Sequence, residues 1–592
     1  MKKKLLKIFI TVFSVVICVS IFSCSKMFDI EPKSAVSSDQ MYRNVYDADA
    51  AVIGIYGKFL KVLDRYVILN ELRADLSDVT PNSDQFLKQL STHAVTVDNP
   101  YADPRPFYEV ILNCNDALKN FNLMQSKFKM SADEYNQRYS DIGALRSWLY
   151  LQMGIQYGNI PYVTEPIENY NDLQDETKFP RIGFDQLLDN LIQFTESLPY
   201  KMPYPTGSSL LSTYDTYYTE KIFINKNCLL GDLYLWKGNW TQAATAYREV
   251  MRIGEIPYVV NPGEQYYEYY KLAYTGNLSG SNWINIFRNP FGERYCNYEI
   301  IWNLPYDKNF NPKNPFIDLF STSGKYLLKP SDLVINNWNS QFRNDNGVLP
   351  GTPKDIRGLN LSYRMVGGQP EINKYTYNYS LLQPFETNGK VILYRSANLF
   401  LRFSEAANHD GRDRIAYCFL NDGITRNYDN NPSGGNSRDV TNLQQTRFGD
   451  PFTGPYETAP YYFDGRVGDF PQYRNTWYRN IGVRSRSSNM NAAVDSTRSF
   501  NMTVRPRVLT NRANLTDDMD DLLIAESGLE TAFEGNRWGD LLRIALRRQA
   551  TDPNYLANKI GAKFDAAHSA DAATVRAKLS DKANWYLPFR WK

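Results

Sequence analysis

The stretch from Asn225 to Gly254 constrains the fold of this 592-residue sequence more than any other part. One predicted helix carries Leu230, Gly231 and Tyr234, a Gly-Asn turn precedes Trp240, and a second predicted helix carries Ala243, Tyr247 and Val250. This spacing matches the tetratricopeptide pattern, in which small Gly231 and Ala243 let two helices approach while the tyrosines fill the gaps beside them. One such hairpin cannot bury its own apolar face, so further hairpins must stack on it.

Three other stretches have the periodicity of helical hairpins. In residues 141–157, Ala144, Trp148, Leu151 and Ile155 fall on one helix face, and Gly158-Asn159-Ile160-Pro161 ends the helix. A second amphipathic segment follows at 184–198, and further hairpins are predicted at about 394–421 and 522–548. We therefore predict a mainly α-helical fold in which tetratricopeptide-like hairpin repeats form a spine.

Long aromatic loops separate the predicted hairpins. The chain has 43 Tyr, 31 Phe and 10 Trp, or 14% aromatic residues, and helical periodicity fades at 257–390 and 427–514. Short apolar runs such as Glu299 to Trp302 are typical of isolated strands or turns. Because disordered segments contain few aromatic residues, we expect these insertions to be ordered loops with few short strands.

The N-terminus has the features of a bacterial lipoprotein signal. Lys2, Lys3, Lys4 and Lys7 precede an apolar run from Ile8 to Phe22. This run is shorter than the roughly 20 residues that span a bilayer, which predicts a removable signal peptide at residues 1–23. Ile21-Phe22-Ser23-Cys24 resembles a lipobox, so we expect acyl chains such as palmitate on Cys24 to anchor the protein. Plain secretion is the alternative.

Charge and metal-ligand patterns exclude several classes of function. The net charge is only +2 and no basic stripe indicates nucleic-acid binding. Cys114, Cys228, Cys296 and Cys418 form no CxxC pair and are expected to be buried thiols. Three histidines, His93, His409 and His568, leave no plausible zinc cluster, and no cofactor is predicted. His93 stands alone in a polar segment and is expected at the surface.

Several segments, in this order, resemble the SusD/RagB family. They are Ala144–Tyr150 with Tyr157-Gly158-Asn159-Ile160-Pro161, the hairpin at Leu229–Tyr247, Glu299–Trp302, Asp355-Ile356-Arg357, Lys374-Tyr375, Glu405-Ala406-Ala407-Asn408, and a C-terminal series of Glu526, Glu530, Phe533, Glu534, Gly535, Arg537, Trp538, Asp540, Leu541 and Arg543. Each motif is weak alone, but the series covers nearly the whole chain. The resemblance divides the mature chain into an N-terminal region at 24–255 and a loop-rich C-terminal region at 256–592.

The C-terminal carboxylates are interpreted as structural. Glu526, Glu530 and Glu534 are spaced to lie along one helix face, whereas a glycosidase needs two carboxylates on opposite sides of a cleft. Arg537 is placed to pair with Glu534 or with a carboxylate of a neighbouring helix. We therefore predict no catalytic residues and no enzymatic activity.

The resemblance implies a surface-exposed outer-membrane lipoprotein. Such a protein would bind glycans and deliver them to a SusC-like TonB-dependent transporter. Peptide uptake, as in the RagB branch, is the nearest alternative; a secreted glycan-degrading enzyme and a periplasmic tetratricopeptide scaffold are others.

The candidate ligand-binding residues lie in loop-like, aromatic-rich stretches. Sugars present flat C–H faces and hydroxyl edges, so a site needs aromatic platforms together with hydrogen-bonding side chains, whereas a peptide site needs backbone partners. The residues predicted to hydrogen-bond ligand are Arg73 and Asp78, and the predicted platforms are Tyr101, Tyr274 and Trp283.

Overall fold

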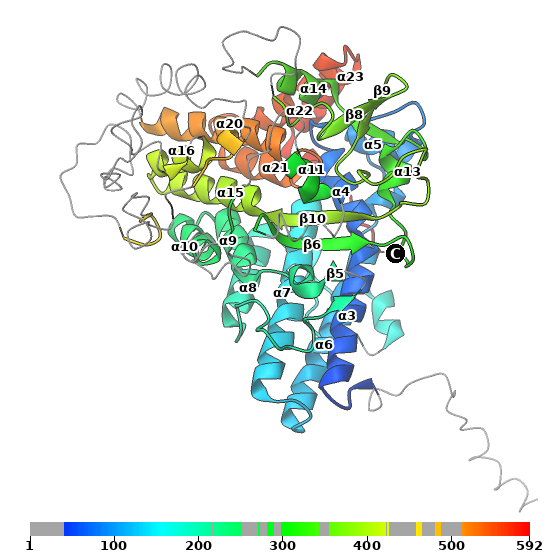
Figure 1. Cartoon of the computed structure of the whole chain (residues 1–592), viewed down its shortest axis with the longest axis vertical. Helices are drawn as coiled ribbons and strands as arrows, with labels where there is room; N and C mark the ends of the chain where they lie inside the picture. The colour runs from blue at the N-terminus through cyan, green and yellow to red at the C-terminus, as the bar shows by residue number, and fades with distance from the viewer. Residues whose placement is uncertain are drawn as a thin grey trace, which may run out of the picture.

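The structure is a computed structural model that describes residues 41–591 except 168, 215–216, 252–269, 273–280, 289–297, 342–354, 422, 425–457, 464–476, 478–479 and 487–511. It is mainly α-helical, with short strands in two-stranded sheets (Figure 1). Cys24, the predicted boundary at 255–256 and most of the loop-like stretch 427–514 lie outside the described residues. The predicted helical fold class is confirmed.

Six α-helices, of which α6 and α7 are the longest, form most of the described N-terminal part of the chain. They are α3 (Val45–Leu60), α4 (Leu63–Glu71), α5 (Gln85–Ser91), α6 (Arg105–Ser126), α7 (Ala132–Tyr157) and α8 (Phe184–Ser197). α7 starts before the predicted residue 141 because Ser131 and Glu134 form a capping box, which satisfies two backbone N–H groups at the helix start. It ends at Gly158, whose φ of 71° lies in the left-handed region that glycine tolerates.

The tetratricopeptide-like hairpin is present as predicted. It consists of α9 (Lys226–Lys237) and α10 (Trp240–Val250). The Asn225 side chain caps α9 by accepting a hydrogen bond from the Cys228 amide. A Cβ atom on Gly231 would lie 2.3 Å from the Tyr247 ring, so glycine is required for the close approach of the two helices.

The other predicted hairpins stack on this one. They are α15 (Ser396–His409) with α16 (Asp413–Leu420), and α20 (Arg512–Glu530) with α21 (Arg537–Arg547). Contacts run from α7 through α8 and α9 to α10, and then through α15 to α20 and α21. Where the α9–α10 hairpin meets the α15–α16 hairpin, the rings of Trp240 and His409 stack with centroids 4.5 Å apart. The hairpins therefore form the continuous spine that the sequence predicts.

Short strands form five two-stranded sheets among the described residues. The strands are β1 (Ser77–Val79), β2 (Ile160–Pro161), β3 (Arg181–Ile182), β4 (Thr213–Tyr214), β5 (Tyr217–Tyr218), β6 (Ile300–Tyr306), β7 (Leu328–Pro330), β8 (Tyr363–Val366), β9 (Gln369–Ile372) and β10 (Gly389–Arg395). β6, predicted as an isolated strand or turn, pairs antiparallel with β10, Val391 lying opposite Leu304 (Figure 1). The short helices α11 (Ser281–Phe287), α13 (Phe316–Phe320) and α14 (Asp332–Asn339) occur in the same half of the chain.

The C-terminal end of the chain returns to the N-terminal helices. α22 (Tyr555–Ala566) and α23 (Asp571–Leu579) form a further helical pair, which the sequence analysis did not predict. α21 packs on α4, and α22 packs on α14. A tail at residues 580–591 follows α23.

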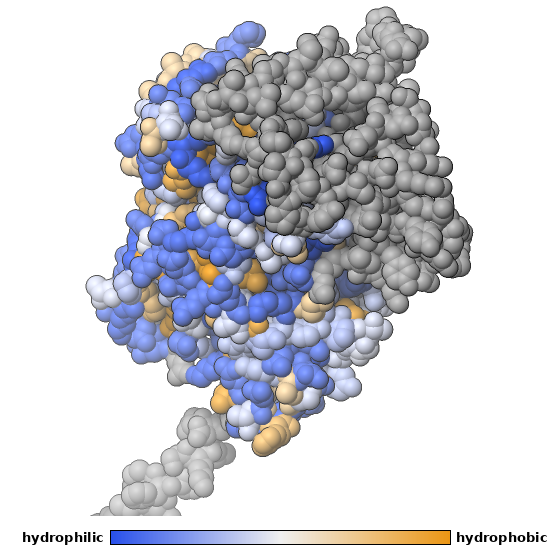
Figure 2. Space-filling view, turned by 90° about the vertical axis from the view of Figure 1, so that its left-hand side faces the viewer, coloured by the Kyte–Doolittle hydropathy of each residue, from blue (hydrophilic) through white to orange (hydrophobic). Residues whose placement is uncertain are grey.

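One large apolar core contains residues from Tyr42 to Leu587. Three of the four predicted buried thiols, Cys114, Cys228 and Cys418, are buried; Cys296 is outside the described residues. The described part of the face in Figure 2 is largely hydrophilic, with apolar residues scattered across it. Among the described helices, none combines the length and the apolar character required to cross a membrane.

Candidate functional site

The C-terminal tail crosses the end of α7. The Leu587 amide donates a hydrogen bond to the Gln156 carbonyl oxygen at 2.8 Å, and the Trp591 indole N–H donates to the Leu173 carbonyl oxygen at 3.1 Å. The buried Trp585 indole is held by the Leu579 carbonyl oxygen at 2.7 Å. The bonds of Leu587 and Trp591 fix the tail against segments that precede it by some 400 residues in the chain, and that of Trp585 fixes it to the end of α23.

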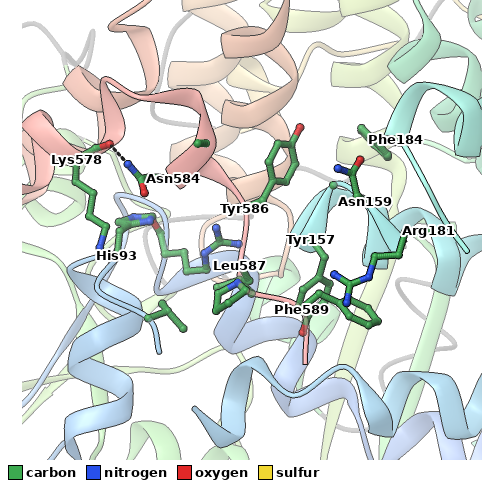
Figure 3. A pocket seen from close by; sticks show the side chains of 15 residues that line it. His93, Tyr157, Asn159, Arg181, Phe184, Lys578, Asn584, Tyr586, Leu587 and Phe589 are labelled. Atoms are coloured by element: carbon green, nitrogen blue, oxygen red, sulfur yellow. Dashed lines mark hydrogen bonds between the residues drawn. The ribbon is translucent and has the colours of Figure 1, made fainter. Parts of the chain in front are cut away.

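A cavity of about 630 Å³ lies where the tail, α7, β3 and α23 meet. Figure 3 shows the side chains around it. The lining residues that matter for its chemistry are Arg73, His93, Tyr157, Asn159, Arg181, Phe184, Lys578, Asn584, Tyr586 and Phe589. The cavity thus combines aromatic rings with amide, guanidinium and ammonium groups.

Close packing of the tail shapes the aromatic walls of the cavity. A Cβ atom on Gly158 would lie 3.1 Å from the Tyr586 ring, so glycine at this helix end leaves room for that ring. Phe589 packs edge-on against Tyr157, with ring centroids 5.5 Å apart. The Arg181 guanidinium lies 4.6 Å from the centroid of the Phe589 ring, in a cation–π arrangement.

Arg73 forms the buried floor of the cavity. Its side chain is 1% exposed and donates to Gln156 Oε1 at 2.5 Å and to the Trp585 carbonyl oxygen at 2.8 Å. The guanidinium stacks 3.9 Å from the Trp538 ring centroid, and its Nε has no hydrogen-bond partner. Burial lowers the pKa of Arg73 to about 9, which still leaves the group positively charged at neutral pH.

His93 is buried beside Arg73, so the predicted surface position is wrong. Its Nε2 lies 2.8 Å from the Arg73 carbonyl oxygen, and its ring lies 5.3 Å from that of Trp538. Its polar neighbours in the sequence predicted a solvent-exposed side chain. The backbone instead turns after α5, with a positive φ of 57° at His93, and the side chain is buried. Burial, together with the charges of Arg73 and Lys563, lowers the pKa of His93 well below its usual value, so the ring is neutral at pH 7.

A second cavity of about 480 Å³ shares Phe589 with the first. Its walls include Tyr108, Leu112, Leu173 and Trp591. Phe589 in the C-terminal tail therefore separates the larger, more polar cavity from the smaller, more apolar one.

Comparison with known proteins identifies the fold. No protein-family model and no curated protein matches the sequence. A SusD superfamily protein from Bacteroides vulgatus superimposes with a TM-score of 0.53 at 14% identity, covering 92% of this chain and 96% of that one. A laminarin binding SusD-like protein gives 0.51 at 15% identity, covering 92% and 96%. A SusD-like carbohydrate binding protein from Bacteroides fragilis gives 0.51 at 13% identity, covering 86% and 87%. The chain has the SusD-like fold.

In this SusD-like fold, Arg73 is the predicted site residue that lines the larger cavity. Asp78 lies on β1 and accepts a hydrogen bond from the Val79 amide at 2.8 Å. The Tyr101 hydroxyl donates to Asp84 at 3.0 Å, and the Trp283 ring is fully buried in a small apolar cluster. Tyr274 lies outside the described residues. The structure does not bring Asp78, Tyr101 or Trp283 into either cavity, and their part in ligand binding stays a prediction.

Most of the residues that line the larger cavity were not predicted from the sequence. Tyr157 and Asn159 belong to the Tyr-Gly-x-x-Pro segment, which was interpreted as a helix end and as part of the family resemblance but not as part of a site. The aromatic run from Trp585 to Phe589 was a usable signal, because a short, aromatic-rich C-terminal segment must pack somewhere. No feature of the sequence indicated that these two segments lie next to each other in the fold.

The carboxylates Glu526, Glu530 and Glu534 are fixed in a buried ion network, as the structural interpretation predicted. The Glu530 carboxylate binds Arg357 at 2.8 Å, Arg395 at 2.7 Å and Arg486 at 2.6 Å, all at 0% side-chain exposure. Burial would raise the pKa of Glu530, but these three guanidinium groups hold it well below its usual value. None of the three carboxylates lines either of the two cavities.

Two details of the predicted carboxylate arrangement are wrong. Glu534 follows the end of α20 and lies in the turn before α21, so the three carboxylates do not share one helix face. Of the two partners predicted for Arg537, Glu534 is wrong, since its own partners are Arg395 and Lys374. Arg537 instead pairs at 2.6 Å with Asp75, a carboxylate in the segment that follows the neighbouring helix α4. The turn at Gly535 separates residues that a continuous helix would have placed together. Within the described ranges, no group of three or more His, Cys, Asp and Glu side chains could hold a metal ion.

Proposed function

We propose that this protein is a lipid-anchored, surface-exposed receptor that binds glycans and delivers them to a SusC-like TonB-dependent transporter. The observation that carries the proposal is the larger cavity, where aromatic rings and hydrogen-bonding side chains line the same space. Support also comes from the fold, which is shared with a laminarin binding protein and with a carbohydrate binding protein. We further propose that it acts by binding alone, without hydrolysis.

The composition of the cavity suits a sugar better than an extended peptide. Tyr586 and Phe589 offer ring faces for the apolar C–H side of a sugar, while Asn159 and Asn584 offer amides for hydroxyl groups. A peptide would need an unpaired backbone edge for strand addition. The strand nearest the cavity, β3, has one edge paired with β2 and is only two residues long, so its other edge is too short to seat an extended peptide. Peptide binding is therefore an alternative outcome of the test rather than the proposal.

Removing the aromatic walls should weaken glycan binding. We expect Tyr586→Ala and Phe589→Ala each to lower affinity for the best glycan on an oligosaccharide and peptide array by about tenfold, since one ring contact contributes roughly 1 kcal/mol beyond its buried area. Affinity is measured by titration calorimetry, and circular dichroism checks the fold. Phe128→Ala is the matched control, because this ring is 94% exposed at the turn between α6 and α7.

The array experiment also separates the alternatives. Binding to peptides but not to glycans would favour the RagB-like alternative. Release of reducing sugar from any bound polysaccharide would contradict the proposal that the protein acts without hydrolysis.

The anchor is tested independently of the ligand. We expect antibody or protease added to intact cells to reach the wild-type protein, and Cys24→Ser to move it from the membrane fraction to a soluble fraction, because stable anchoring requires several acyl chains. Cys18→Ser lies within the predicted signal peptide and serves as the control. A wild-type protein that stays protected until the outer membrane is permeabilised would instead favour a periplasmic scaffold.

A further inference from the structure

The larger cavity has an imbalance of charge. Its lining includes the cationic side chains of Arg73, Arg181 and Lys578 together with neutral His93, and no Asp or Glu is among the lining residues. Arg181 is paired outside the lining with Glu176, at 2.5 Å. A cavity wall of one sign focuses its field on whatever enters the cavity.

Arg73 differs from the arginines of the buried ion network. Arg357, Arg395 and Arg486 each contact at least one carboxylate at 3.0 Å or less. Arg73 is equally buried, yet its hydrogen-bond acceptors are a side-chain amide and a backbone carbonyl, both uncharged. Buried charges are normally paired, so a buried cation that lacks a carboxylate and lines an open cavity points to an anion supplied from outside.

A second buried cation lies behind the cavity floor. Lys563 on α22 donates to the carbonyl oxygens of Leu72 and Ser77 and to the Ser91 hydroxyl, at 3.0 to 3.2 Å. Its ammonium group therefore also binds only neutral acceptors. The carboxylates whose charges act on Lys563 are those of Asp78 and Asp75. Asp75 is already held by Arg537 at 2.6 Å, so Asp78 is the main counter-charge of Lys563, and Arg73 remains a buried cation without a carboxylate partner among the described residues.

Lys578 is the cation best placed to touch a ligand. Its side chain is only partly buried on α23 and extends toward His93 in Figure 3. Within the part of the chain that the structure describes, its amino group forms no hydrogen bond or ion pair. Asn584 is fixed beside it, because its side-chain amide donates to the Lys578 carbonyl oxygen at 2.9 Å. Lys578 and Asn584 therefore line the cavity together.

We propose that this cavity binds the carboxylate of an acidic sugar residue, a hexuronate, within a glycan. Lys578 contacts the carboxylate, Arg73 supplies positive potential from the floor, and Tyr586 and Phe589 hold the sugar ring. The cavity volume of about 630 Å³ exceeds what an inorganic anion needs, and its aromatic walls suit a sugar ring rather than a bare ion. This inference rests on the proposed function and narrows it to one class of glycan.

The test compares sugars that differ only in charge. Detergent-solubilised full-length protein is titrated with tetrasaccharides of galacturonate, mannuronate and glucuronate and with their carboxyl-reduced, neutral counterparts, at 50 and 300 mM NaCl. We expect at least one uronate to bind tenfold or more tightly than its neutral counterpart, with the preference falling at the higher salt concentration. Lys578→Glu should then weaken uronate binding at least tenfold and change neutral binding less than twofold.

Lys127→Glu is the matched control, because Lys127 is an exposed lysine at the turn between α6 and α7 and this variant has the same change in net charge. It should leave uronate affinity within twofold of the wild type. Equal affinity for uronates and their neutral counterparts would overturn the inference and leave the proposed function intact. Binding of sulfated oligosaccharides in preference to uronates would also overturn it. If no carbohydrate binds, both the inference and the proposed function fail.

Discussion

Replacing Glu530 with glutamine is expected to lower the free energy of unfolding by about 3–5 kcal/mol, the usual cost of breaking a buried ion pair. The Glu530 carboxylate joins three guanidinium groups from distant parts of the chain: Arg357 after α14, Arg395 at the start of α15, and Arg486. Glutamine preserves the shape but removes the charge, so three buried cations must share the remaining carboxylates. Chemical denaturation followed by circular dichroism measures the loss.

The matched control is Glu109→Gln. Glu109 pairs with Lys58 at 2.5 Å, but its side chain is 64% exposed, so its pair should contribute about 1 kcal/mol or less. A loss below about 1 kcal/mol for Glu530→Gln as well would mean that this network does not hold the hairpins together.

The dependence on pH gives an independent check of the same network. Because the arginines hold the pKa of Glu530 below its usual value of 4.5, the unfolded chain binds a proton that the folded protein does not. Unfolding therefore takes up protons below about pH 4.5, and wild-type stability should fall as the pH decreases. Glu530→Gln cannot take up this proton, so its stability should fall less steeply over the same range.

The spine could be predicted from sequence because its signals are local. The spacing of Gly231, Ala243 and Tyr247 specifies how two neighbouring helices pack, and all three residues lie within one hairpin. The apolar spacing of Val52, Tyr56 and Phe59 in α3 is equally regular, so this helix was readable by the same rule although it was not predicted. Local periodicity therefore accounts for the architecture far better than for the site.

The larger cavity could not be predicted because it joins segments that are remote in the sequence. Arg73, Tyr157 and Tyr586 come from three regions, and only the fold brings them together. Trp283 illustrates the opposite error: an aromatic residue in a loop-like stretch was expected to be a platform, but it packs into a small core with Ile286 and Phe287. Aromatic composition alone does not distinguish rings that cover a loop from rings that face a ligand.

Gly535→Ala is expected to lower the free energy of unfolding by about 2–4 kcal/mol, from backbone strain and from overpacking. Gly535 has φ of 83°, in the left-handed region, and a Cβ atom there would lie 2.3 Å from the ring of the buried Tyr66 on α4. Its amide also donates to Glu71 Oε1 at 2.6 Å. The substitution therefore strains the turn before α21 and pushes on the helix that leads to Arg73.

Gly368→Ala separates the two contributions to this loss. Gly368 has nearly the same φ, 82°, in the turn between β8 and β9, but no atom lies within 4 Å of where its Cβ would be. The Gly368→Ala variant should therefore lose only the stability that backbone strain costs, about 1–2 kcal/mol of the free energy of unfolding, and should keep its ligand affinity. Gly535→Ala should lose more stability and also weaken glycan binding, because Tyr66 cannot give way without moving α4. Equal losses for the two variants would mean that the Gly535–Tyr66 contact does not position the cavity floor.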